Sequence, residues 1–442
     1  MIRICVLSLL FAFASAARAQ PAKGVPELAA LDRVYPSLDA LYQDLHRNPE
    51  LSNHEEKTAA KLAARMRELG LEVTEHVGGT GVVAVLRNGN GPTVLVRTDL
   101  DALPLKESTG LPYASTVTTK NDAGEVTSVM HACGHDIHMA SWVGAAALLA
   151  GQKDRWRGTV VFVGQPAEEL VTGAKAMVKD GLFTRFPKPD FVVGLHDTNF
   201  IPAGHVGLVA GPASAASNAV DITFHGKSGH GAAPHRAIDP IVMASRTVEA
   251  LQTLVSRENN PFDPAVVTVG TFRAGTKRNI IPDDAKLELT VRSYKPEVQK
   301  KLLAGIERIA KAQAASAGAP REPTVVVLPD EASEVVVNDP ALVQRLGTPL
   351  KRALGDTVTT IEPTSASEDF GVFGRVAGAP SVQLRIGASE PAEFAKAKAA
   401  GTLPPGPHNS SFAPVKEPTI RAGVSALTIS VLELLGKPRE QG

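Results

Sequence analysis

The sequence predicts an α/β fold whose chain is interrupted by a smaller α+β insertion. In the first half of the chain, short continuous apolar runs alternate with helical patterns, at 82–87, 93–97, 159–164 and 191–195. Runs of this kind are typical of strands that helices cover on both faces of a sheet. Near residue 211 the pattern changes to strands accompanied by two long helices.

The remaining elements follow from apolar spacing and from the glycine and proline residues that bound each run. Before residue 211 we expect helices at 38–47, 55–69 and 137–150. The insertion is expected to contain strands at 220–225, 266–272, 286–294 and 324–328, and helices at 241–255 and 296–315. After it come a helix at 340–354, a strand at 381–386 and a helix at 420–435. The α/β unit is therefore split in sequence, with parts expected at 30–210 and 331–440 and the insertion at 211–330.

Residues 1–19 predict a cleavable secretory leader. Arg3 provides the positive charge, residues 4–14 are an apolar core, and Ala17-Arg18-Ala19 is a small-x-small cleavage site. The apolar run is too short to span a bilayer as a stable helix. The sequence therefore predicts a periplasmic or secreted protein.

The charge balance gives no electrostatic reason to expect a nucleic acid or an anionic membrane as a partner. The 442 residues contain 46 Lys+Arg and 46 Asp+Glu, so the formal net charge is zero. Of the two cysteines, Cys5 lies in the predicted leader, and the mature chain keeps only Cys133. One thiol cannot form an internal disulfide, so its presence in an exported protein needs another explanation.

Cys133 lies in the run MHACGHDIHMA, which also contains His135, Asp136 and His138. A thiol among imidazoles and a carboxylate is either a metal ligand or a nucleophile with His135 or His138 as its base. The spacing allows both interpretations. The metal is favoured, because a bound metal would protect an exported thiolate from oxidation.

Acidic and imidazole groups follow three of the predicted strands directly. They are Asp99 and Asp101 in VLVRTDLDALP, Glu168 and Glu169 in VVFVGQPAEEL, and His196 and Asp197 in FVVGLHD. Ligands of open α/β sheets bind at the carboxyl ends of strands, so we expect these groups to converge on one site. Thiolate, imidazole and carboxylate are donors for zinc and its neighbours, and a mixed set suits a pair of ions that acidify a shared water. One of the adjacent glutamates can then bind metal while the other takes the proton from the water.

Further motifs occur in the order found in a known family. They are HRNPELSNHE, GKSGHGAAPH, NIIPD, SEDF and PHNSSF, and with the motifs above they cover residues 35–435. The chain resembles amidohydrolases of the aminoacylase, hippurate-hydrolase and auxin-conjugate-hydrolase type. These belong to a larger dinuclear metallopeptidase family that includes glutamate carboxypeptidases. The resemblance implies a catalytic domain with a mixed sheet flanked by helices, and it makes the insertion a lid and dimerisation domain.

The resemblance implies a metal centre of two divalent ions, whether zinc, manganese, cobalt or nickel. Glu168 matches the general base of the family. Glu368 and Asp369 of SEDF lie near the site in the family, with no role that the sequence assigns. The matching metal ligands are Cys133, His135, Glu169, His196 and His408, with the cysteine bridging the two ions.

The resemblance also implies residues that act on the substrate. His230 matches a lid histidine that reaches the site of the partner subunit in a homodimer and stabilises the oxyanion; His235 is the weaker match. Asn279 and Arg292 match lid residues that bind the carboxyl end of the substrate. Asp101 matches an acidic position behind the metal ligands.

The implied reaction is hydrolysis of the amide bond of N-acyl or N-aroyl amino acids, and the alternative is a metallocarboxypeptidase or dipeptidase acting on short peptides. The chain departs from the family at Ile137 and Met139, where Gly and Thr are usual, and at Asp197-Thr198-Asn199, where Val-x-Pro is usual. Two other classes of protein are consistent with the motifs: a cysteine hydrolase and a periplasmic binding protein. An unligated Glu168 beside the ions argues against the binding protein.

Overall fold

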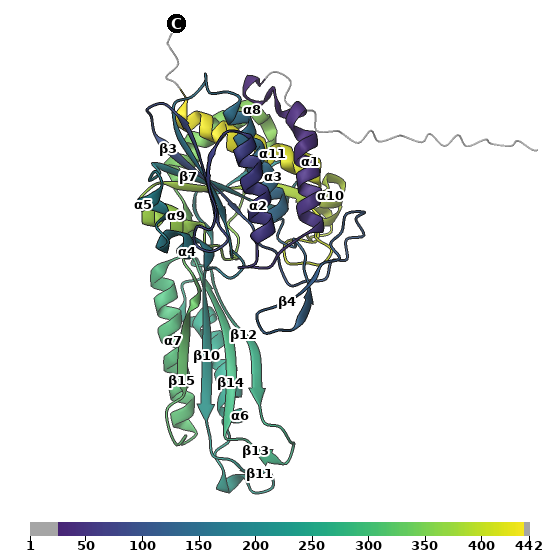
Figure 1. The fold of residues 1–442 in the computed structure, drawn as a ribbon. Helices are drawn as coiled ribbons and strands as arrows, with labels where there is room; N and C mark the ends of the chain where they lie inside the picture. Colours follow the sequence, from purple (N-terminus) through teal and green to yellow (C-terminus); the bar gives the residue numbers. More distant parts are fainter. Residues whose placement is uncertain (1–24, 437–442) are drawn as a thin grey trace, which may run out of the picture.

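The computed structural model describes residues 25–436, and the predicted leader lies outside them. The chain forms two units: a helix-flanked body, and an elongated lid, residues 216–333, that projects from it (Figure 1). The segments before and after the lid both belong to the body. This is the predicted α/β fold with an inserted α+β unit.

The body is built on one mixed sheet of eight strands. In spatial order these are β1 (Glu72–Thr74), β2 (Val82–Asn88), β6 (Gly158–Gln165), β3 (Thr93–Asp99), β7 (Phe191–Pro202), β18 (Ser381–Ser389), β8 (Val206–Leu208) and β17 (Val358–Thr360). The central strands β6, β3, β7 and β18 are parallel, whereas β2 and β8 run antiparallel to their inner neighbours. The parallel centre brings the ends of three motif-bearing strands to one edge of the sheet.

Helices cover both faces of this sheet, because successive side chains of a strand point to opposite sides. Val94 and Val96 of β3 belong to one hydrophobic core, and Leu95 between them belongs to another. The first core is closed by α1 (Leu31–Arg47), α2 (Glu56–Glu68), α3 (His135–Ala150), α8 (Pro340–Leu354) and α11 (Lys416–Leu435). The second is closed by α4 (Gly173–Lys179), α5 (Leu182–Arg185) and α9 (Gly371–Ala377), while α10 (Pro391–Ala399) buries no residue.

Helix α11 is long and apolar enough to cross a membrane by length and composition alone. However, 78% of its apolar window is buried inside the body, where it packs against α3 and β7. It is therefore a core helix of the fold.

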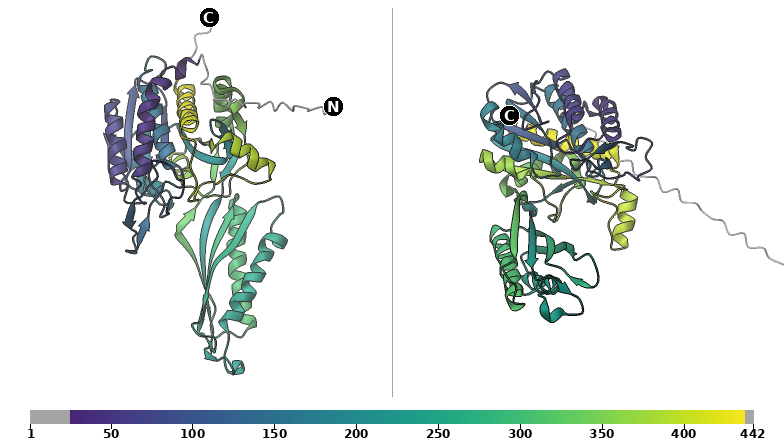
Figure 2. Two further views of the ribbon diagram at one scale, coloured as in Figure 1. Left: turned by 90° about the vertical axis from the view of Figure 1, so that its right-hand side faces the viewer. Right: turned by 60° about the horizontal axis from the view of Figure 1, so that its bottom comes forward.

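The lid is a four-stranded antiparallel sheet with two helices on one face (Figure 2). In spatial order the strands are β12 (Ala265–Ala274), β14 (Asp284–Ser293), β10 (Ala216–His225) and β15 (Thr324–Ser333). Helices α6 (Pro240–Thr253) and α7 (Pro296–Ser316) cover Leu287, Leu289 and Val291 of β14. Because side chains alternate along a strand, Thr290 and Arg292 lie on the face that the helices leave open.

The far end of the lid, here called the tip, is a small sheet of β11 (Gly229–His230) and β13 (Ile280–Ile281). Strands β10 and β14 pair from Ala216 with Ser293, beside the body, to His225 with Asp284, beside the tip. Ten residue pairs of a strand span about 30 Å, so the tip is held far from the body. The chain enters the lid through β9 (Gly211–Ser214) and leaves it through β16 (Val336–Asn338), which pair with each other.

The expected end of one strand was wrong. The apolar run predicted that β7 stops at residue 195, which would place His196 and Asp197 in the following loop. The strand continues to Pro202, because β18 pairs along it and matches Arg385 with His196. His196 is therefore held by the sheet itself.

Candidate metal centre and active site

Cys133 and His135 reach the same space because Gly134 bends the backbone between them. Gly134 precedes α3 with a φ of 75°, a conformation that L side chains rarely adopt. A Cβ at this position would lie only 2.0 Å from Asp197 Oδ2, so the turn requires glycine. Cys133 Sγ then faces His196 Nε2 across 3.6 Å.

Two histidines present an unprotonated Nε2 to this space. His135 Nδ1 lies 2.8 Å from the backbone oxygen of Asp101, and His196 Nδ1 lies 2.8 Å from the backbone oxygen of Asp197. A carbonyl oxygen can only accept, so each Nδ1 carries the hydrogen and each Nε2 keeps its lone pair. A histidine needs this arrangement to bind a metal through Nε2.

Asp101 contacts two of the predicted ligands from behind. Its carboxylate accepts a hydrogen bond from the backbone N–H of Glu169 at 3.0 Å and one from the Ser52 hydroxyl at 2.6 Å. Its other oxygen lies 3.3 Å from His135 Nδ1. Burial would raise the pKa of Asp101, but the hydrogen bond with His135 outweighs burial and lowers it. Asp101 therefore holds His135 and Glu169 in position as an anion.

Glu168 and Glu169 lie in a strained loop that follows β6. Ala167 and Val171, on either side of the pair, have φ values of 45° and 57°, which are unfavourable for residues with a Cβ. Glu55 holds this loop by accepting a hydrogen bond from the Ala167 N–H at 2.8 Å. The loop places Glu168 Oε2 3.7 Å and Glu169 Oε1 3.8 Å from His135 Nε2. Strain of this kind is typical of loops that aim functional side chains.

His408 reaches the pair from the C-terminal part of the chain. Its Nε2 lies 3.3 Å from Glu169 Oε2, and its backbone N–H donates to the oxygen of Ala132 at 2.7 Å. His408 has a φ of 65°, so its backbone is also strained. Contact with the backbone next to Cys133 therefore fixes the position of this fifth predicted ligand.

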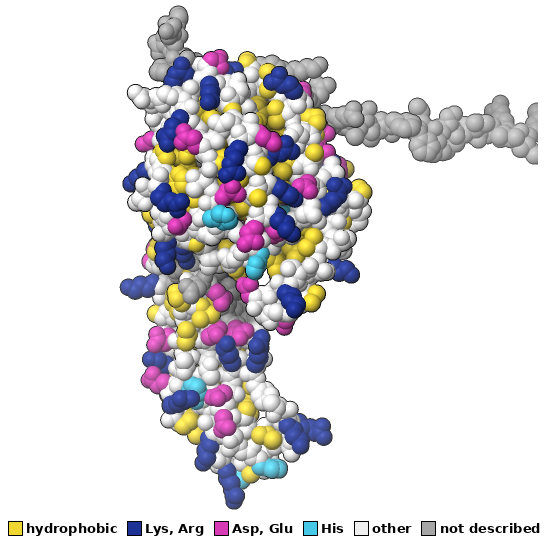
Figure 3. Space-filling view, viewed as in Figure 1, with side chains coloured by type: hydrophobic (Ala, Val, Ile, Leu, Met, Phe, Trp, Pro, Cys, Tyr) yellow, Lys and Arg dark blue, Asp and Glu magenta, His cyan; other side chains and the backbone are white. Residues whose placement is uncertain are grey.

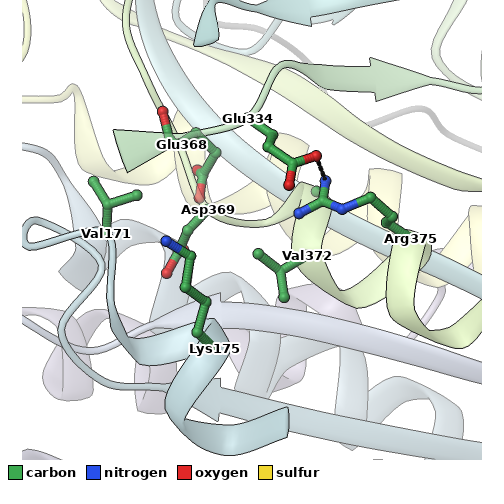
Figure 4. Close-up of a pocket in the computed structure, with 9 residues that line it drawn as sticks. Val171, Lys175, Glu334, Glu368, Asp369, Val372 and Arg375 are labelled. Atoms are coloured by element: carbon green, nitrogen blue, oxygen red, sulfur yellow. Dashed lines mark ion pairs between the residues drawn. The ribbon is translucent and has the colours of Figure 1, made fainter. Parts of the chain in front are cut away.

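Glu368 and Asp369 neutralise a buried arginine next to the site. Arg97 is fully buried, and its guanidinium lies 2.6 Å from Asp99, 2.9 Å from Glu368 and 3.4 Å from Asp369. Figure 4 shows the two acidic residues on the wall of a small cavity beside Lys175. The cluster joins β3 to the segment that follows the lid, so it ties together the two sequence halves of the body.

The same carboxylates affect the proton affinity of Glu168. This side chain is 5% exposed, and burial raises its pKa well above the usual range. The charges of Glu368, Glu169 and Asp369 raise this pKa further, and Arg97 lowers it only in part. Glu168 is thus suited to accept and hold a proton.

The surroundings of Cys133 favour a metal ligand over a free nucleophile. His138 uses both ring nitrogens elsewhere: Nδ1 lies 2.7 Å from Asp99 Oδ1, and Nε2 accepts the Asp197 N–H at 2.9 Å. It is therefore not free to act as a base for the thiol. Burial, and then the charges of Glu169 and Glu168, raise the pKa of Cys133 well above its usual range. A thiolate here requires positive charge close by, which metal ions provide.

The donor atoms fit a centre of two cations. The ligand atoms of Cys133, His135 and His196 lie within 4.8 Å of one another, and so do those of Cys133, Glu169 and His408. Cys133 belongs to both groups. Within residues 25–436, several buried polar atoms in this space lack a hydrogen-bond partner: His135 Nε2, Glu169 Oε1 and both carboxylate oxygens of Asp197. Buried polar groups are normally paired, so these free valences indicate a place for cations.

A cavity of about 850 Å³ opens from these donors toward the lid. Its size suits a small organic substrate. The open face of the lid contributes Thr290 and Arg292 to its wall. The body contributes Cys133, Glu168, Glu169, His196, Arg385 and His408, among others.

Two predicted substrate-contacting residues lie away from this cavity in their own chain. His230 belongs to β11 at the tip, and the backbone oxygen of Asn279 accepts a hydrogen bond from the neighbouring Gly231 N–H at 2.9 Å. Neither residue lines the cavity. His230 Nδ1 accepts the Ala232 N–H at 3.1 Å, so its exposed Nε2 carries the hydrogen and can donate it.

Comparison with known proteins agrees with this geometry. A family model described as peptidase family M20/M25/M40 matches residues 95–400. The chain belongs to this family. As a member, it is a hydrolase of amide or peptide bonds.

Several relatives in the M20 family cover most of the chain. A hippurate hydrolase of Campylobacter jejuni is 38% identical over 352 residues, which are 79% of this chain and 87% of the relative. Thermostable carboxypeptidase 2 of Saccharolobus solfataricus is 34% identical over 397 residues, 89% of this chain and 94% of the relative. A crystal structure from Bacillus subtilis, described as a dinuclear metal-binding peptidase of the M20 family, has a TM-score of 0.73 and 29% identity and covers 91% of this chain and 100% of that one.

Sequence analysis of this M20-family chain assigned no role to residues that shape the site from a distance. Glu55 lies in the quoted motif HRNPELSNHE, yet only the fold shows that it holds the loop of Glu168. His46 of the same motif lies 2.6 Å from Asp136 and 3.1 Å from Glu107. Burial lowers the pKa of His46, but these hydrogen bonds raise it to about 10. No spacing rule links His46 to Asp136, because α1 and α3 meet only in the folded chain.

Proposed function

We propose that the protein is a metal-dependent amidohydrolase that cleaves N-acyl or N-aroyl amino acids. One observation carries the proposal: a buried glutamate with a raised pKa, Glu168, stands beside two overlapping groups of metal-ligand atoms and a substrate-sized cavity. The relative named hippurate hydrolase supports this substrate class. The relative named carboxypeptidase supports the neighbouring possibility of short peptides.

Five residues would hold two divalent ions. When bound, the ions would polarise the scissile carbonyl and lower the pKa of water. Cys133 Sγ belongs to both groups of donor atoms, which suits a bridging ligand. His135 and Glu169 are held by Asp101, so the ligands are positioned before any metal binds. The proposed ligands are Cys133, His135, Glu169, His196 and His408.

Glu168 performs the proton transfers in this proposal. It takes the proton of the attacking water and passes it to the nitrogen of the leaving amine. Burial and the neighbouring carboxylates raise its pKa, which lets the side chain hold the proton between the two transfers. Asp197, behind His196 and His138, does not compete for this role, because its carboxylate is fully buried.

Arg292 supports a requirement for a free carboxylate next to the scissile nitrogen. It points into the cavity, and its Nη1 is buried without a hydrogen-bond partner among the described residues. A guanidinium matches a carboxylate with two parallel hydrogen bonds. We therefore expect N-benzoylglycine to be hydrolysed in the presence of zinc or manganese, and its methyl ester to be cleaved at the amide far more slowly.

Replacing Arg292 by alanine should raise KM and lower kcat/KM by roughly ten- to a hundredfold, since a charge-assisted pair contributes about 1.5–3 kcal/mol. Release of glycine from N-benzoylglycine measures the effect, and the exposed Arg375→Ala is the matched control. Equal cleavage of the free acid and the ester at the amide would remove this role from Arg292. No hydrolysis of any N-acyl amino acid would reject the proposed function.

We further propose that the protein works as a homodimer in which His230 acts on the partner's site. The lid holds the tip about 30 Å from the body, so His230 does not reach the cavity of its own chain. Figure 3 shows basic and histidine side chains gathered at the tip. The exposed residues there include Lys227, Arg236, Lys277 and Arg278, whereas the cavity is lined by Glu168, Glu169, Glu362 and Glu368. These opposite charges favour docking of the tip on a second copy.

A mixture of two inactive variants tests this arrangement. His230→Ala and Glu168→Gln should each be inactive alone, and their heterodimer should regain partial activity, because one of its two sites contains both side chains. Differently tagged subunits, purified together and assayed with N-benzoylglycine, provide the measurement. His235→Ala, also exposed at the tip, is the control and should stay active. A verified heterodimer with no recovered activity would show that His230 does not act in trans.

A further inference from the structure

The wall of the cavity contains a second arginine that the proposed reaction does not use. Arg385 lies on β18, where it pairs in register with the predicted ligand His196 of β7. Parallel strands place side chains in register on the same face of a sheet. Val382, Leu384 and Ile386 point to the opposite face and belong to the main core. Arg385 therefore extends from the strand next to His196 toward the cavity.

The charge of Arg385 is buried and not neutralised by a direct contact. The residue is 6% exposed, and the one hydrogen bond of its guanidinium in the described chain is to Ser214 Oγ at 2.7 Å. No carboxylate oxygen of residues 25–436 with a described side chain lies within 4.0 Å of it. Burying an unpaired charge is unfavourable, so this arrangement calls for an anionic partner.

Arg97 shows how the same protein treats a structural arginine. Its guanidinium is also buried, but Asp99, Glu368 and Asp369 surround it, Gln165 accepts a further hydrogen bond, and it lines no substrate cavity. Arg385 differs from it in each of these respects. A purely structural role for Arg385 would leave both its missing carboxylate and its place on the cavity wall unexplained.

The cavity thus offers two guanidinium groups from two different units of the fold. Arg292 comes from the lid and Arg385 from the body, and neither forms an ion pair with a described side chain. An N-acyl amino acid with one carboxylate would neutralise only one of them. The second matches a second carboxylate elsewhere on the same molecule.

We propose that Arg385 binds a second carboxylate of the substrate, so that the enzyme prefers N-acyl amino acids carrying two acidic groups. The inference rests on the proposed function and narrows its substrate class. The second carboxylate can belong to the amino-acid side chain or to the acyl group. The chemistry at Arg385 is the same in both cases, and matched substrates separate them.

Two pairs of substrates, equal in shape and different in charge, test the proposal. N-benzoyl-L-glutamate is compared with N-benzoyl-L-glutamine, and N-succinylglycine with its terminal amide. In at least one pair the acid should have a kcat/KM roughly 10- to 100-fold above that of the amide. In Arg385→Met the ratio for that pair should fall to about one, and in Arg385→Lys it should be intermediate, because lysine keeps the charge but not the fork. Arg375→Met should keep the wild-type ratio.

Binding provides a measurement that does not depend on turnover. Calorimetric titration of the Glu168→Gln protein with the preferred acid and its amide should show the same preference, and adding Arg385→Met should abolish it. Thermal unfolding of each variant establishes that it is folded. A wild-type ratio near one in both pairs, or an unchanged ratio in folded Arg385→Met, would overturn the proposal. If no N-acyl amino acid is hydrolysed, the proposed function fails, and the titration still decides whether Arg385 selects a second carboxylate.

Discussion

Removing divalent metal should abolish hydrolysis of N-acyl amino acids. Five donor side chains converge within two overlapping groups, and buried atoms such as His135 Nε2 have no other partner in the described chain. We expect about two ions per chain in the purified protein, loss of activity in chelator, and recovery with zinc, manganese, cobalt or nickel. Elemental analysis and the hydrolysis assay provide the two measurements.

Variants make this test specific to the proposed centre. His196→Ala should lower the metal content, since its Nε2 faces Cys133 Sγ across 3.6 Å. His235→Ala, at the tip of the lid, should leave the metal content unchanged. A metal-free protein with full activity would contradict the metal centre and would return Cys133 to the role of nucleophile.

Replacing Glu168 by glutamine should lower kcat by about 10²–10⁴-fold and keep the metal ions, because a general base contributes about that factor. Glutamine keeps the shape of the side chain but cannot accept the proton of water. Glu169→Gln is the matched comparison, because it changes the neighbouring carboxylate, which lies beside His408 and His135. This second variant should lose metal first and activity as a consequence. If Glu168→Gln loses metal and Glu169→Gln keeps it, the two roles must be exchanged.

The ligand-bearing motifs were recognisable because most of their geometry is local. Cys133 and His135 are two residues apart, and the glycine between them makes the turn that the site needs. The α/β alternation was equally clear, because continuous apolar runs identify buried strands. The end of β7 was not predictable in the same way. His196 and Asp197 are polar, and only pairing with β18, nearly two hundred residues later, keeps them in the sheet.

Residues whose roles depend on contacts distant in sequence were out of reach for the same reason. The role of Glu368 depends on Arg97, a residue on the other side of the lid segment, and that of Arg385 on its register with His196. In the sequence both look like ordinary charges near a strand. Their significance lies in what surrounds them, which a spacing pattern does not encode. His230 could be matched to a motif, but its distance from the cavity became visible only in the lid.

The split body has a consequence for the order in which the protein is made. Ribosomal synthesis delivers Cys133, His135, Glu169 and His196 before the lid, and His408 well after it. Until β18 emerges, β7 is an edge strand, and Arg97 lacks Glu368 and Asp369. The lid, by contrast, has its own core built from contacts within 216–333. It can therefore fold on the nascent chain while the half-made body still exposes an apolar sheet edge, which makes that stage of synthesis the one most open to aggregation and to help from chaperones.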